Sequence, residues 1–127
     1  MIQTVTIELT RPLWWTSNDL PNMHRMAIAA KAKAVRTLAA DVATAARMAR
    51  VDRCRVLVTA SIPTRSRFDP CNIAGTVSKH AIDGLTDAGL WVDDDSEHVV
   101  LVAFQRGPKT GVRGLYRLTF EIEEVPA

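Results

Sequence analysis

The chain has 127 residues, and this length predicts one compact domain spanning residues 1–127. Hydrophobic residues make up 47% of the chain and charged residues 24%, a balance that excludes a disordered or fibrous protein. No apolar run approaches the length of a membrane span, so we expect a soluble cytoplasmic protein that makes no membrane contact. The formal net charge of +2 hides a division, because residues 1–68 carry +7 and residues 69–127 carry −5. Such a division is typical of solvated surfaces, and also of proteins that hold phosphates with cations and a metal with carboxylates.

The first half of the chain predicts a strand, a helix and a second strand. Residues 2–9 alternate between apolar and polar side chains, as a half-buried strand does. Residues 24–48 place apolar side chains at helical spacing and predict a long first helix. Alternation returns over residues 53–62 and puts Cys54 on the buried side of the second strand. Cys54 and Cys71 are both expected to be free thiols.

The second half predicts a helix followed by two strands. Helical spacing over residues 73–88 indicates a second amphipathic helix, and Gly89 is placed to end it. Residues 98–105 are apolar on both faces, which favours a central strand. The glycines of residues 107–114 predict the turn of a hairpin into a last strand within residues 115–124. The expected fold is therefore α/β (α+β), a small mixed sheet with two helices in the order β-α-β-α-β-β.

Acidic residues stand on both sides of the second predicted helix. Asp69 follows the second strand, Asp83 is in the helix, and residues 93–95, all aspartate, lead into the third strand. A helix packed against two neighbouring strands can bring such positions together. Adjacent carboxylates near a helix end repel one another, and Mg²⁺ prefers oxygen ligands of this kind. The alternative is that the acidic turn is only solvated and that Lys79 and Asp83, at i,i+4, form a simple ion pair.

This region resembles the RusA family of Holliday-junction resolvases, the crossover junction endodeoxyribonucleases. The motif consists of Asp69, Asn72, Lys79 and the run DGLTDAGLWVDD at residues 83–94. The resemblance is specific from Lys79 to Asp94 and extends more loosely to residues 17–36. It implies a RusA-like fold and a homodimeric endonuclease that uses Mg²⁺, with Mn²⁺ as a substitute. Such an enzyme nicks opposed strands of four-way DNA junctions symmetrically during recombination and repair in the bacterial cell, and phages or prophages often encode it.

The resemblance also implies roles for individual residues. Asp69, Lys79 and Asp94 match catalytic positions, and Asp83 and Asp93 match recurrent acidic positions. The expected metal ligands are Asp69, Asp83, Asp93 and Asp94. The chain departs from the family pattern in having Cys71 where many members have a second aspartate. In addition, the interval from Asn72 to Lys79 is four residues longer than in the better-known pattern.

Basic and polar residues near this motif are the expected DNA contacts. Arg65 and Arg67 immediately precede Asp69, so a phosphate bound beside a metal there would meet them as well. The full expected set is Arg65, Arg67, Asn72, Lys79, His24, Arg25 and Lys31. His24 can equally cap the first helix. Trp14 and Trp15 can stack on unpaired bases, or fold over the core.

Two other functions remain open on this sequence. A catalytically inactive branched-DNA-binding module would bind junctions without cutting them, and Cys71 is the feature that favours it. A small oligomeric interaction protein with a purely structural acidic turn would have no DNA affinity at moderate salt.

Overall fold

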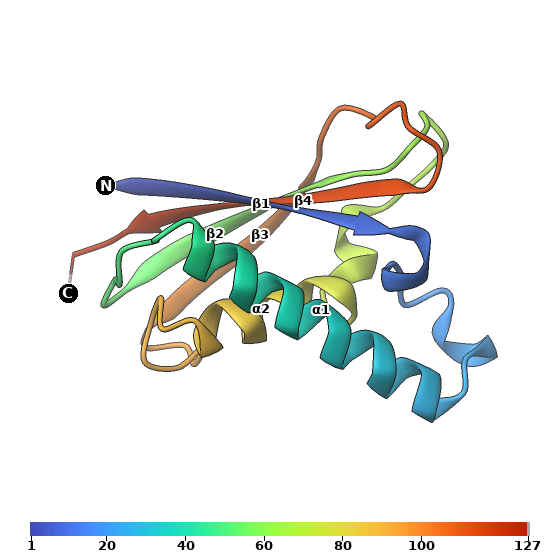
Figure 1. The fold of residues 1–127 in the computed structure, drawn as a ribbon. Coiled ribbons are helices and arrows are strands. Elements are labelled where there is room, and N and C mark those ends of the chain that lie inside the picture. The colour runs from blue at the N-terminus through green and yellow to red at the C-terminus, as the bar shows by residue number, and fades with distance from the viewer. Residues whose placement is uncertain (127) are drawn as a thin grey trace.

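A computed structural model describes residues 1–126 and contains a four-stranded sheet with two helices on one of its faces (Figure 1). The elements are β1 (Ile2–Thr10), α1 (Arg25–Ala45), β2 (Cys54–Ser61), α2 (Val77–Asp87), β3 (Val99–Arg106) and β4 (Leu115–Glu124). Short 3-10 turns cover Arg11–Leu13, Leu20–Asn22 and Pro70–Ile73. The predicted α+β class and the order β-α-β-α-β-β are confirmed.

The sheet has the strand order β1-β4-β2-β3, with β2 and β3 parallel and the other neighbours antiparallel. Alternation along the strands puts one set of apolar side chains on the face under the helices, where Ile7, Val58 and Phe120 are fully buried. The buried residues of α1 are Val35, Ala39 and Ala43, two of which are small. Cys54 is buried in this core, and Cys71 is exposed on the surface; both are free thiols, as expected.

The two helices pack against each other at close range. A Cβ added to Gly84 in α2 would lie 2.3 Å from the carbonyl oxygen of Arg36 in α1, so only a glycine allows this approach. The guanidinium of Arg36 also donates to both carboxylate oxygens of Asp87, with N–O distances of 2.6 and 2.8 Å. These contacts hold α2 at a fixed distance from α1 and thereby position the side chains that α2 carries.

The second helix begins later than its spacing predicted. The expected helix over residues 73–88 is replaced by the 3-10 turn Pro70–Ile73 and by α2 from Val77. Thr76 interrupts helical geometry with φ −122° and ψ −115°. Its hydroxyl donates to the carbonyl of Trp15 at 2.9 Å, a buried hydrogen bond that ties this break to the loop after β1. At the other end Gly89 has φ +86° and follows the last turn of α2, as predicted.

The last two strands are arranged differently from the prediction. β3 is an edge strand, not a central one, and β3 and β4 form no hairpin because β4 lies between β1 and β2. The segment between them passes the end of β2, where the N–H groups of Gly107, Thr110 and Gly111 donate to the carbonyls of Ala60, Ile62 and Pro63. These bonds carry the chain from one side of β2 to the other, so that β4 enters the middle of the sheet.

No helix among the described residues is long and apolar enough to cross a membrane.

Candidate functional site

The helix α2 places Lys79 and Asp83 on the same exposed side, one turn apart. Lys79 Nζ lies 3.5 Å from Asp83 Oδ1, so the ion pair expected from their spacing is formed. His80 Nδ1 lies 3.7 Å from the other carboxylate oxygen of Asp83. The His80 ring also stacks on Trp15, with 5.7 Å between ring centroids. His80 therefore packs between the loop after β1 and the body of α2.

Lys79 and Asp94 line one cavity of about 260 Å³ between α2 and the edge strand β3. Its other walls are apolar and include Ile82, Val102 and Phe104. An ammonium and a carboxylate that share a partly apolar cavity can bind a ligand that combines negative charge with a bound cation. The two residues at the ends of the most specific part of the motif are thus brought together from elements 15 positions apart in the chain.

Charges around this cavity act on one another through space. Asp87 raises the pKa of Arg36 by its hydrogen bonds first and its charge second, and Asp83 and Asp94 raise it further. Arg36 in turn lowers the pKa of Asp87, mainly through the same hydrogen bonds. The pKa of His80 is lowered, with burial as the largest cause and Asp83 acting in the opposite direction. At neutral pH His80 is therefore neutral, and the cations next to Asp83 are Lys79 and Arg36.

The remaining acidic residues of the motif hydrogen bond to their own loops. Asp69 Oδ1 accepts from the N–H of Cys71 at 3.0 Å, and Asp93 Oδ1 accepts from the N–H of Asp94 at 2.8 Å. Asp95 accepts from the backbone N–H and from the ring of His98, and that ring bond lowers the pKa of Asp95. Asp69 and Asp93 are exposed, and neither lines the cavity of Lys79 and Asp94.

Residues 1–126 contain no group of three or more histidine, cysteine or acidic side chains arranged to hold a metal ion. Mg²⁺ does not require such a group, because it commonly binds through one or two carboxylates together with water and a substrate phosphate. Asp94 in the cavity, with Asp83 beside Lys79, supplies oxygen ligands of the right kind. Asp94 lines the cavity and Asp83 does not, so the described residues form no closed metal cage, and a magnesium ion here would need ligands from water and a bound phosphate.

The expected DNA contacts fall in three places. Arg65 and Arg67 are exposed in the loop after β2, Arg25 is exposed at the start of α1, and Asn72 lies half-buried in the turn Pro70–Ile73. His24 Nδ1 accepts from the N–H of Met26 at 3.1 Å, so it caps α1.

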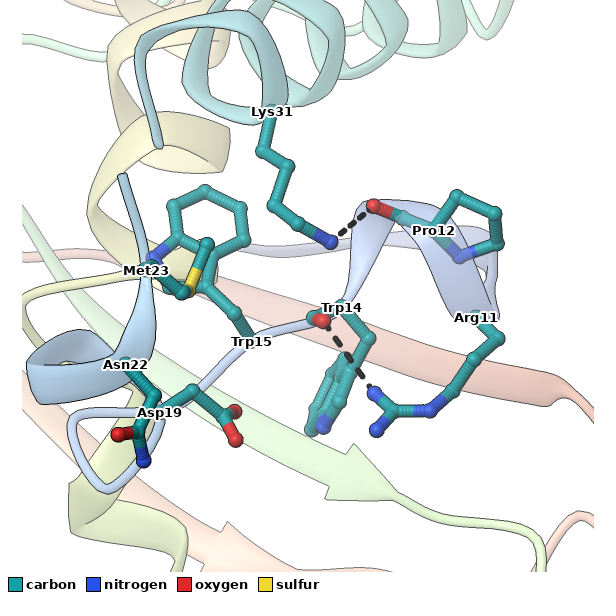
Figure 2. A pocket seen from close by; sticks show the side chains of 8 residues that line it. All are labelled: Arg11, Pro12, Trp14, Trp15, Asp19, Asn22, Met23 and Lys31. Carbon is teal, nitrogen blue, oxygen red and sulfur yellow. Dashed lines mark hydrogen bonds between the residues drawn. The ribbon is translucent and has the colours of Figure 1, made fainter. Parts of the chain in front are cut away.

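Lys31 extends from α1 to the carbonyl of Pro12 and lines a hollow beside Arg11 (Figure 2). Trp14 and Trp15 are 4% and 1% exposed, so they fold over the core and present no free ring to a base. No separate role for Arg11 and Arg113 was expected from the sequence, although Arg11 lines the same hollow as Lys31 and both arginines line a second hollow. Each stands at a chain reversal, Arg11 before Pro12 and Arg113 before Gly114, and this placement is the signal that could have identified them.

Comparisons with known proteins add little to this picture. No family model and no curated protein matches the chain. Among solved structures, the chain is similar to the E. coli hydrogenase maturation protein HypE, with 12% identity and a TM-score of 0.32. The match covers the whole of this chain and 33% of the HypE chain. A TM-score this low is no evidence that the two proteins share a fold or an activity.

Proposed function

We propose that the protein is a Mg²⁺-dependent DNA endonuclease of the RusA type that acts as a homodimer and nicks four-way junctions symmetrically. The observation that carries this proposal is the cavity that Lys79 and Asp94 both line. Both residues belong to the stretch of sequence that resembles the family most specifically. The net positive charge of residues 1–68 supports a nucleic-acid substrate.

The chemistry divides between the protein and the metal. Lys79 would contact the scissile phosphate and offset the negative charge that builds on it, while Asp83 holds the ammonium in place at 3.5 Å. Asp94 and Asp83 would hold Mg²⁺ against that phosphate, with Asp69 and Asp93 as the further acidic residues that the resemblance implies. When bound, Mg²⁺ supplies an activated water and neutralises phosphate charge. The apolar side chains of Ile82, Val102 and Phe104 form the remaining walls beside these groups.

The test is cleavage of a labelled synthetic four-way junction and of a linear duplex of matched sequence, with Mg²⁺ or with EDTA. The wild type should nick the junction at symmetric positions only when Mg²⁺ is present. Asp94→Asn should reduce the cleavage rate at least a hundredfold while leaving junction binding within about threefold of the wild type. Asp41→Asn is the matched control, because Asp41 is an exposed carboxylate on α1 outside the cavity. Cleavage by Asp94→Asn at the rate of Asp41→Asn would refute the assignment.

A catalytically inactive junction-binding module is the second candidate, and Cys71 favours it. Cys71 is exposed next to Asp69 and stands where many family members have an aspartate. If the wild type binds junctions without cutting them under Mg²⁺ or Mn²⁺, Cys71→Asp should restore metal-dependent cleavage. Absence of cleavage in that variant as well would favour a protein that only binds.

A further inference from the structure

Three hollows share Arg11, the residue that follows β1. Figure 1 shows that this end of β1 lies at the opposite end of the sheet from the N-terminus. The volumes of the hollows are about 450, 740 and 240 Å³. Each pairs Arg11 with a second cation: Lys31 in the first, Arg113 in the second and Arg67 in the third. We call this surface the Arg11 groove. It is formed by the loops after β1, after β2 and before β4, together with α1.

The cations of the Arg11 groove have no acidic partner among the described residues. None of Arg11, Lys31, Arg67 and Arg113 lies within 4.0 Å of a carboxylate oxygen there. Asp19 is the one carboxylate that lines the hollows, and its Oδ2 accepts from the N–H of Thr16 at 2.9 Å. Four positive charges in adjoining hollows, with one engaged carboxylate, leave a strong attraction for an anion.

Aromatic side chains beneath the groove support Arg11, the cation that the three hollows share. Trp14 stacks on Tyr116 with 4.7 Å between ring centroids, and the Arg11 guanidinium lies 5.9 Å from the Tyr116 ring. Beside them Arg106 lies over Phe68 and donates to the carbonyl of Ser66 at 2.6 Å. Trp14 is almost fully buried, so it and Tyr116 serve as a floor for Arg11.

Lys31 and Arg11 are held close enough to repel each other. Lys31 donates to the carbonyl of Pro12, and Arg11 Nη1 donates to the carbonyl of Trp14 at 3.5 Å (Figure 2). Burial is the largest cause of the lowered pKa of Lys31, the charge of Arg11 is the next, and Asp19 acts in the opposite direction. An anion placed between the two side chains would relieve this repulsion.

We propose that the Arg11 groove binds consecutive phosphates of a DNA strand and directs that strand toward the cavity of Lys79 and Asp94. A central arginine shared by three hollows, each with its own second cation, matches a repeating anion better than a single small one. The link to the cavity is the segment 67–74. Its start, at Arg67 and Phe68, lines the Arg11 groove, and its end, at Ala74, lines the cavity. A strand that follows this segment passes Asp69 on the way.

This inference rests on the proposed function for the identity of the ligand, but binding can be measured without cleavage. The experiment is fluorescence anisotropy with a labelled four-way junction in EDTA, at salt concentrations between about 50 and 200 mM. The variants are Arg113→Gln, Arg67→Gln and Lys31→Gln. The matched control is Arg50→Gln, which removes one exposed charge near the start of β1, where the neighbouring Ala49 N–H donates to Gln3. Thermal unfolding of each variant checks that the fold is kept.

Each groove variant should bind the junction about tenfold more weakly than the wild type and lower the log–log salt slope by about 0.9. Arg50→Gln should change the dissociation constant less than twofold. Groove variants that behave like Arg50→Gln would overturn the inference, even if the wild type cuts junctions. If the wild type never cuts junctions but the groove variants lose junction binding, the result would support DNA binding by the Arg11 groove and refute the endonuclease activity. If the wild type binds a labelled RNA strand more tightly than DNA, and the groove variants lose as much affinity for RNA as for DNA, the choice of DNA as the ligand would be overturned.

Discussion

Gly84→Ala tests the close packing of α2 on α1, on which the geometry of the candidate site depends. The added Cβ would lie 2.3 Å from the Arg36 carbonyl oxygen and 2.8 Å from Ala39 Cβ, whereas ordinary contacts begin at 3.4 Å. Because the nearest atom belongs to the backbone of a 21-residue helix, no side-chain rotation can relieve the overlap. The helices must move apart by about 1 Å, which disturbs the core between them.

The expected cost follows from two opposing effects. Overpacking of this severity lies at the upper end of the usual range, about 3 kcal/mol. Alanine recovers about 1 kcal/mol because it is the better helix former in the middle of α2. The net loss in the free energy of unfolding is then about 2 kcal/mol. For a chain of this length such a loss lowers Tm by about 8 °C.

The assay is thermal unfolding followed by circular dichroism, with urea denaturation to obtain the free energy. Gly75→Ala is the matched control, because a Cβ at Gly75 meets nothing within 4 Å and its φ is not in the left-handed region. We expect the control to stay within about 0.5 kcal/mol of the wild type. A Tm for Gly84→Ala equal to or above that of the wild type would show that α2 does not approach α1 as described.

Three further predictions concern stability. Ser78→Ala should raise the free energy of unfolding by about 1 kcal/mol in urea denaturation, because the Ser78 hydroxyl is buried with no hydrogen-bond partner among the described residues. Asp87→Asn should cost less than about 1 kcal/mol at low salt and still less at high salt, since the pair with Arg36 is exposed and screened. The pKa of His80 in the folded protein lies below its ordinary value of 6.5. At a pH between the folded-state pKa and 6.5, the unfolded chain therefore binds more protons than the folded protein, and stability falls as the pH is lowered through 6.5. His80→Phe keeps a ring against Trp15 but cannot titrate, so its urea midpoint should fall less between about pH 7 and 5.5 than that of the wild type.

Local patterns predicted most of the fold because they depend on near neighbours in the chain. Alternation located β1 and β2, an apolar run located β3, helical spacing located both helices, and Gly89 marked the end of α2. The position of β4 was not predictable in this way, because its place between β1 and β2 is set by pairing between distant segments. The break at Thr76 was missed for a similar reason, since its hydroxyl bonds to Trp15, 61 residues away.

In the candidate site, too, residues close together in the chain were predicted and residues from distant segments were not. The motif identified Lys79, Asp83 and Asp94, which lie on or beside one short helix, and the structure brings Lys79 and Asp94 to one cavity. Arg11 and Arg113 were not identified, because they meet only when loops from opposite ends of the chain converge. The charge difference between the two parts of the sequence indicated cations for phosphate but could not say where they gather.

The positions of the two ends of the sheet allow a circular permutant of the protein. Met1 and Glu124 are neighbours, since the Glu124 N–H donates to the Met1 carbonyl at 3.0 Å, and both lie where β1 begins, whereas Arg11 follows its last residue. A short linker could therefore join them, and the chain could be reopened between Gly107 and Gly114. Such a circular permutant would keep every strand pairing but would open the loop between β3 and β4 that contains Arg113. It would separate the contribution of that loop to the proposed DNA binding from its contribution to the fold.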